Sequence, residues 1–207
     1  MTGYNSRDKK VNSILLWLAM FAFLFGTLAG CSVVPTVAPT TTHFFLLDAV
    51  DIVERADKED DGYSVGIHPV VLPSYLNRPQ LVSRIALNEL YLSENNRWGE
   101  PLKENISRVL FENIKAILEN SKVERLPKQG KQPAYAIQVY IDRFERFPDQ
   151  RIYLDAYWKI GGGDRGELMR SASLISDPVD VAGESATVKS MSELLKQLSI
   201  EISASIK

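Results

Sequence analysis

The chain has few of the residues that build disulfides and metal centres. Its 207 residues include one cysteine, Cys31, and two histidines, His43 and His68. A single cysteine excludes an intramolecular disulfide and any multi-cysteine zinc site. Two histidines leave little for a histidine-based metal centre, and we interpret His68, beside Pro69, as structural. We therefore expect no metal and no cofactor.

The sequence also lacks an excess of charge of either sign. It has 24 basic residues against 26 acidic residues, a formal net charge of -2. A nucleic-acid-binding protein would show a basic excess gathered on one face, so we expect no nucleic-acid partner. Hydrophobic residues at 45% and charged residues at 24% are ordinary for globular proteins and exclude wholesale disorder.

The N-terminal region has the three parts of a secretory signal. Residues 1–10 carry a net positive charge, an apolar run extends from Ile14 to Ala29, and small residues precede Cys31. Length alone leaves a permanent membrane helix open, because about 20 residues can cross a bilayer. The small residues that end the run distinguish the signal peptide from the membrane helix. They favour a signal peptide that comprises residues 1–30.

The ending Leu28-Ala29-Gly30-Cys31 resembles the bacterial lipobox, which implies that Cys31 is acylated; the alternative is a buried free cysteine. The residue after Cys31 is Ser32 and not Asp; an Asp at this position resembles the inner-membrane retention signal of enterobacteria. For a Gram-negative source this favours the periplasmic leaflet of the outer membrane. We interpret residues 31–42 as the acylated cysteine and a Pro/Thr-rich tether, and residues 43–207 as a single periplasmic domain.

Hydrophobic patterns in the rest of the chain predict alternating strands and helices. A compact apolar run predicts a buried strand at 43–50, followed by an acidic loop at 51–62. A strand is also expected at 63–72, where Pro69 suggests an edge strand or a strand end, and a pair of short strands is expected over 80–93, turning near Asn88. Apolar residues spaced three and four apart predict helices from Leu102 to Leu118 and from Val188 to Ile206.

Three further segments, 135–141, 152–160 and the weaker 168–175, have strand-like alternation or composition. The short links at 147–151 and 161–167 imply antiparallel pairing. The predicted fold class is α/β, a mixed and partly antiparallel sheet with two long helices packed on it, with α+β as the alternative.

Motifs for catalysis or nucleotide binding do not fit their surroundings. Residues 161–166 match G-x-G-x-x-G, but a dinucleotide fingerprint must open a helix, and the segment that follows resembles a strand. We interpret this match as a hairpin. Neither histidine accompanies a nucleophile motif such as G-x-S-x-G, so we predict no catalytic residue.

Two segments, residues 72–84 and 96–102, combine prolines, arginines and aromatic residues. In one interpretation Arg78 and Arg84 pair with carboxylates and Trp98 packs at the start of a helix. In the other, Tyr75, Arg78, Arg84, Arg97 and Trp98 form a partner interface, because Arg, Tyr and Trp are enriched in interface hot spots. The residues alone leave both interpretations open.

These segments also carry a family resemblance. The stretches LPSYLNRPQLVSR (72–84), LYLSENNRWGEPL (90–102) and RVLFENI (108–114) resemble the ABC-type transport auxiliary lipoproteins of the PqiC/YmbA group. The resemblance implies a non-catalytic lipoprotein that accompanies an MCE-domain protein in intermembrane lipid transport, contributes to envelope integrity and self-associates into a homo-oligomer. The long acidic loop at 51–62 departs from the pattern.

Two other functions stay open on the sequence. One is a periplasmic enzyme whose catalytic carboxylates cannot be located from sequence. The other is a structural envelope lipoprotein that binds peptidoglycan.

Overall fold

The computed structural model describes residues 40–49, 62–119, 121–127, 132–162, 165–179 and 183–206, together with the helical Trp17 and Met20. The chain divides into two units, Met1–Pro39 and Thr40–Lys207. Cys31 and almost all of the acidic segment 51–62 lie outside the described residues. Among the residues described, no helix is long and apolar enough to span a membrane.

The second unit contains one mixed sheet and two long helices, as predicted. Its elements in chain order are β1 (His43–Phe45), β2 (Ser64–Ile67), β3 (Gln80–Ala86), β4 (Glu89–Trp98), α2 (Leu102–Ile117), β5 (Lys122–Arg125), β6 (Tyr135–Arg146), β7 (Ile152–Gly162), β8 (Arg165–Ile175) and α3 (Glu184–Ala204).

Strand β6 is the branch point of the sheet. Along one side it pairs antiparallel with β7, which in turn pairs antiparallel with β8. Along the other side its first half pairs parallel with β2, which also pairs with β5. The far end of β6 meets β3 where Ser83 lies opposite Arg146, and β3 continues the sheet to β4 and β1.

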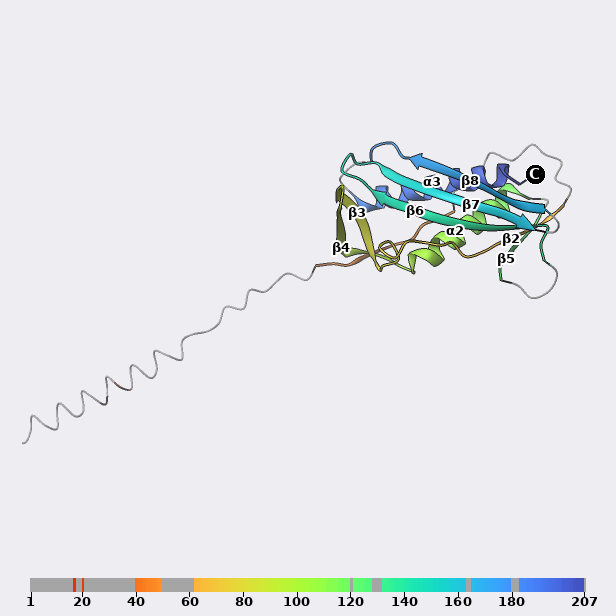
Figure 1. Ribbon diagram of the computed structural model, residues 1–207. Coiled ribbons are helices and arrows are strands. Elements are labelled where there is room, and N and C mark those ends of the chain that lie inside the picture. Colours follow the sequence, from red (N-terminus) through yellow and green to blue (C-terminus); the bar gives the residue numbers. More distant parts are fainter. Residues whose placement is uncertain are drawn as a thin grey trace, which may run out of the picture. The chain divides into compact units, whose positions relative to one another are not determined.

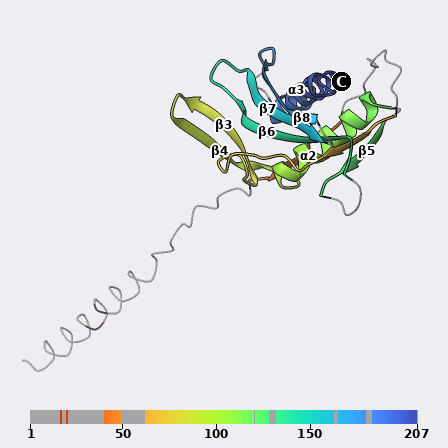
Figure 2. The ribbon, with the colours of Figure 1, turned by 45° about the vertical axis from the view of Figure 1, so that its right-hand side comes forward.

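The sheet curls into a half-barrel, and α2 and α3 lie on the same side of it (Figures 1 and 2). Helix α2 begins directly after Pro101, whose φ of -54° already suits a helix start. Helix α3 buries a stripe of apolar and small residues, from Thr187 through Leu195 to Ser203. Both helices thus present to the sheet the faces that the periodicity predicted.

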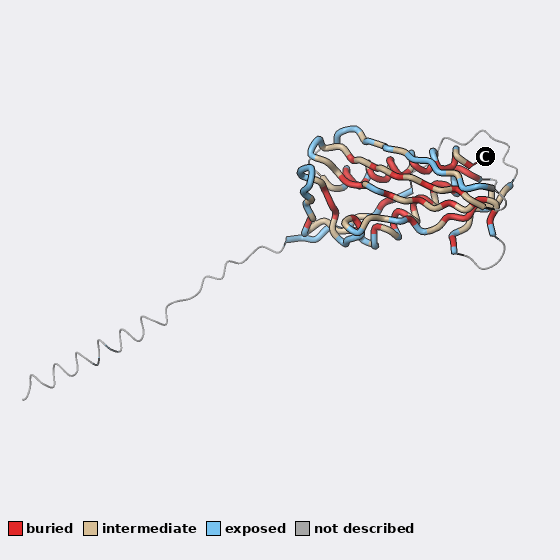
Figure 3. The backbone as a smooth tube through the Cα atoms, viewed as in Figure 1, coloured by how far each residue is buried: buried red, intermediate tan, exposed pale blue. Residues whose placement is uncertain are grey.

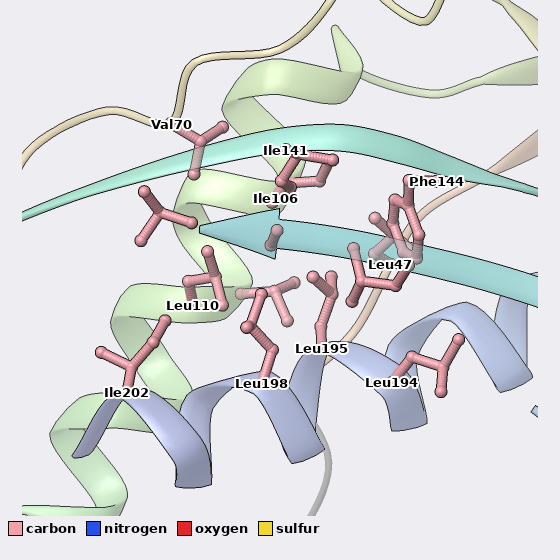
Figure 4. Close-up of a cluster of buried hydrophobic side chains, with 14 of the residues drawn as sticks. Leu47, Val70, Ile106, Leu110, Ile141, Phe144, Leu194, Leu195, Leu198 and Ile202 are labelled. Atoms are coloured by element: carbon pink, nitrogen blue, oxygen red, sulfur yellow. The ribbon is translucent and has the colours of Figure 1, made fainter. Parts of the chain in front are cut away.

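The core fills the space between the helices and the sheet. In β7 the residues at even positions from Ile152 to Ile160 are buried, as predicted from their alternation. Leu195 and Leu198 of α3 meet Ile106 and Leu110 of α2 beneath the strands (Figure 4). Buried residues run through the strands and helices, and the turn between β3 and β4 is exposed (Figure 3).

The structure corrects several predicted strands. The segment at 43–50 was expected to be a buried strand, but β1 has three residues at the edge of the sheet, and its Phe44 side chain is exposed. Strand β5 was not predicted, since four residues give too short a pattern. Strand β4 extends to Trp98 and β6 extends to Arg146, both beyond the predicted ends.

Candidate functional site

The five predicted interface residues come from three neighbouring elements, but they do not form one surface. Tyr75 lies in the turn before β3, Arg84 lies in β3, and Arg97 and Trp98 end β4. Two of the five, Tyr75 and Arg84, meet at a residue that the sequence interpretation did not include, Glu145 of β6.

Glu145 is a fully buried carboxylate with a hydrogen-bond donor on every side. Arg84 donates from Nε and Nη2 to Oε1, at 3.0 and 2.9 Å. The Tyr75 hydroxyl donates to Oε2 at 3.0 Å, and the backbone N–H of Phe144 donates to the same oxygen at 2.9 Å. A buried charge is tolerated when it is paired and hydrogen-bonded, and Glu145 meets both conditions.

The electrostatics of the cluster follow from this geometry. Burial and the neighbouring Glu145 carboxylate together raise the pKa of Tyr75 well above its usual value. Burial lowers the pKa of Arg84, but the hydrogen bond to Glu145 and the charge of its carboxylate outweigh that effect and raise it. Tyr75 therefore stays a neutral donor and Arg84 a cation, the states that the carboxylate requires.

A register shift in β6 places Glu145 against Arg84. Pairing with β7 is regular up to Ile141 and resumes at Arg143, so one residue is added to β6 between them. Before the shift, the odd-numbered residues of β6 face the core. After the shift, the alternation is reversed, and the even-numbered Phe144 faces the core. Glu145 therefore points to the opposite face, where the side chains of β3 and the 73–79 turn cover it.

Aromatic and charged side chains extend the Glu145 cluster across the sheet. The guanidinium groups of Arg84 and Arg143 lie 5.3 and 5.2 Å from the ring centre of Phe147. Arg143 also pairs with Asp155 of β7, with Nε 2.6 Å from Oδ2, and Ser173 of β8 donates to the other oxygen of Asp155. Residues of β3, β6, β7 and β8 are thereby joined on one face.

Trp98 belongs to the core. Its side chain is 6% exposed, and its backbone N–H donates to the carbonyl of Pro79 at 2.7 Å. It lines a small internal cavity of about 10 Å³ that also borders Phe144 and Glu184, a volume that fits about one water molecule. Trp98 thus packs in the interior of this fold.

Arg78 and Arg97 are the more accessible of the predicted residues. Arg78 is exposed, and within the described part of the chain its guanidinium makes no hydrogen bond or ion pair. Arg97 is half-buried and donates from Nε to the carbonyl of Glu94 at 3.2 Å. Neither arginine contacts the Glu145 cluster.

The structure locates two further sequence features, the glycine motif and His68. Gly161 and Gly162 end β7, and β8 follows them in place of a helix, so the G-x-G-x-x-G match is a hairpin; Gly163 and Asp164 lie outside the described residues. His68 follows β2 and is half-buried. No group of three or more His, Cys, Asp and Glu side chains that could hold a metal occurs among the residues described.

The structural role of Glu145 could not be predicted from its local sequence. The predicted strand stopped at Ile141, so the residue lay outside every proposed element. The available signal was a glutamate two positions after Arg143, within a run that continues the strand to Arg146. The arrangement as a whole ties strands together, and both carboxylate oxygens are occupied by donors of the fold itself.

A mixed half-barrel sheet that encloses two helices is an architecture shared with solved proteins. An uncharacterized protein of known crystal structure matches with a TM-score of 0.69 and 18% identity, over 81% of this chain and 99% of its own. Protein XCC0632 from Xanthomonas campestris matches with a TM-score of 0.62 and 12% identity, over 80% of this chain and 93% of its own. At these identities the likeness concerns the fold.

The sequence itself matches a family model. Residues 45–203 match the ABC-type transport auxiliary lipoprotein component, and the chain belongs to this family. The match confirms the resemblance drawn from residues 72–84 and 90–102. No curated protein matches the chain. The family is a transport auxiliary lipoprotein component, which indicates association with the cell envelope and with a transport complex.

Proposed function

We propose that this protein is an outer-membrane-anchored, non-catalytic lipoprotein subunit of an MCE-type intermembrane lipid transport system. The observation that carries the proposal is the family match over residues 45–203, together with a lipobox-like sequence at Cys31. The match covers almost the whole folded unit, so the family's auxiliary role applies to the domain as a whole.

The proposed anchor is a lipid on Cys31 after removal of residues 1–30. One acyl chain gives only marginal membrane binding, whereas the two or three chains of a bacterial lipoprotein anchor it stably. Residues 31–42 then connect the lipid to the domain at 43–207. The second compact unit begins at Thr40, three residues before the proposed start of the domain.

The proposed partners are an MCE-domain protein and further copies of this chain. The positions of the five predicted interface residues refine where such contacts could form. Trp98 is buried and Arg84 is engaged with Glu145, so a contact in this region would use the exposed Arg78 and the half-buried Arg97.

The anchor is tested by two neighbouring substitutions. Cys31→Ala should abolish acylation and leave the precursor uncleaved, because the thiol that receives the lipid is gone. In an enterobacterial host, Ser32→Asp should keep acylation but retain the protein in the inner membrane. Mass spectrometry of the purified protein and membrane fractionation measure these outcomes. Normal processing of Cys31→Ala would contradict the lipoprotein assignment.

The partner is tested by co-purification. The lipidated protein should retain an MCE-domain protein after mild detergent extraction, and Arg78→Ala should weaken this retention if Arg78 takes part. Retention of no MCE-domain protein, with acylation intact, would leave a lipoprotein that serves another system and would contradict the proposed transport role.

A further inference from the structure

The segment that begins the folded domain is apolar on both of its sides, but the protein covers only one. Phe45 and Leu47 point inward, and Leu47 is completely buried. Phe44 and Leu46 alternate with them and face outward, with 67% and 47% of their surfaces exposed. A strand with one solvated face ordinarily carries polar residues there, so these two positions depart from the expected pattern.

The outward side of this segment is held in place by β4 and the residue after it. Phe44 lies opposite Arg97 in the parallel pairing of β1 with β4. Gly99 donates its N–H to the carbonyl of Phe45 at 2.8 Å. A Cβ at Gly99 would lie 3.3 Å from the Leu46 side chain, so the absence of a side chain at Gly99 lets Leu46 pack closely against the backbone there. Phe44 and Leu46 are therefore presented by a fixed backbone.

A charged residue lies beside this apolar pair. Arg97 is opposite Phe44 in the pairing of β1 with β4. Phe44 and Leu46 also border an open groove of about 640 Å³ that runs to the start of α3, where Asp48, Lys189 and Glu193 contribute charges of both signs. An exposed aromatic residue with an arginine beside it suits a bilayer interface, where the ring enters the acyl boundary and the guanidinium stays at the headgroups.

The length of the tether keeps this surface near the membrane. Eight residues, 32–39, separate Cys31 from Thr40, the first residue of the folded unit. At no more than about 3.3–3.6 Å per residue, they reach at most roughly 30 Å. A domain of this size has a radius of gyration of roughly 15 Å, so the tether allows the end of the domain at which β1 begins to reach the bilayer that holds the lipid.

We propose that Phe44 and Leu46 insert into the interfacial layer of the bilayer that holds the Cys31 lipid, so that β1 is the membrane-facing edge of the domain. This inference rests on the proposed acylation of Cys31. The occupant of the surface is the phospholipid bilayer, because the tether places one there.

A second exposed apolar site supplies a matched control. Leu87, at the turn between β3 and β4, is 85% exposed, more than Phe44. It lies at the opposite end of β4 from Trp98, which pairs with β1. If exposure alone drove membrane contact, Leu87 would insert at least as well as Phe44.

The test uses the complete lipidated protein and its single cysteine. Acylation consumes the Cys31 thiol, so Phe44→Cys, Leu46→Cys and Leu87→Cys each introduce one reactive thiol for a nitroxide label. Mass spectrometry first establishes that the protein is acylated. The labelled proteins are then reconstituted in vesicles of phosphatidylethanolamine and phosphatidylglycerol, and electron paramagnetic resonance measures label access to oxygen and to a water-soluble nickel complex.

Labels at positions 44 and 46 should favour oxygen over the nickel complex, and the label at 87 should do the reverse. An acylated protein whose label at 44 is as open to the nickel complex as that at 87 overturns this inference and leaves the anchor intact. Strong spin–spin broadening at 44 without oxygen preference also overturns it, in favour of contact with a second copy. A protein without acyl chains overturns the anchor first, and the inference with it.

Discussion

Arg84 and Glu145, which lie 61 residues apart in the sequence, form a charge pair in which two guanidinium nitrogens share one carboxylate oxygen at 3.0 and 2.9 Å. The carboxylate is fully buried and the Arg84 side chain is 20% exposed. The pair joins β3 to β6 close to the single register position, Ser83 opposite Arg146, at which these two strands meet. It therefore reinforces a strand contact that few backbone hydrogen bonds support.

Removal of the Arg84 side chain should strongly destabilise the protein. Arg84→Ala leaves a buried carboxylate without its cation, and loss of one partner of a buried pair costs about 3–5 kcal/mol. Arg78→Ala is the matched control, since Arg78 is exposed, and it should change the free energy of unfolding by less than about 0.5 kcal/mol. Urea unfolding measures both; equal losses would contradict the assignment of the pairing to Arg84.

Tyr75 should make stability depend on alkaline pH. Its pKa in the folded protein is raised, first by burial and then by Glu145, whereas in the unfolded chain it lies near its usual value of about 10. The contribution of Tyr75 is thus fully present below pH ~10 and is lost as the pH rises toward the folded pKa. Between about pH 9 and about pH 11, the free energy of unfolding should fall more in the wild type than in Tyr75→Phe.

The half-exposed Tyr91 provides the control for this titration. Tyr91→Phe leaves the hydrogen bond from Tyr75 to Glu145 in place, so the part of the alkaline dependence that comes from Tyr75 should remain. If Tyr75→Phe and Tyr91→Phe followed the same curve, the hydrogen bond from Tyr75 to Glu145 would not control the titration.

Trp98 and its neighbour Arg97 should respond very differently to truncation. Trp98→Ala removes a large buried side chain and should cost about 3–5 kcal/mol of unfolding free energy. Arg97→Ala should cost less than about 1 kcal/mol, because a partly exposed side chain loses one hydrogen bond to a backbone carbonyl. A stable Trp98→Ala protein that had lost a partner would restore the interface interpretation of this residue.

Adjacent glycines test the hairpin at the end of β7. Gly162 has φ of +140°, and a Cβ there would lie 2.5 Å from the carbonyl oxygen of Ala134, so Gly162→Ala should lose about 1–3 kcal/mol or more. A Cβ at Gly161 meets nothing within 4 Å, so Gly161→Ala should be nearly neutral. Thermal unfolding distinguishes the two; calorimetry should detect no binding of NAD or ATP to either variant or to the wild type.

Much of the architecture could be predicted because it follows from the local spacing of apolar residues. The stripes of α2 and α3 each repeat over more than ten residues and the alternation of β7 extends over nine, and repeats of that length specify both the type of element and its buried face. The same patterns excluded a dinucleotide site, since the glycine motif precedes a strand. The family resemblance at residues 72–84 likewise depended on the linear sequence alone.

Only the tertiary structure decided the roles of single residues. Local sequence could not distinguish Arg84, which pairs with a buried carboxylate, from Arg78, which faces solvent, because the partner lies on a strand 61 residues away. Apolar residues predicted burial for all of segment 43–50, yet burial depends on which elements pack against each face, and Phe44 of β1 is 67% exposed. Periodicity reports the faces that an element has, whereas long-range packing determines which of those faces is covered.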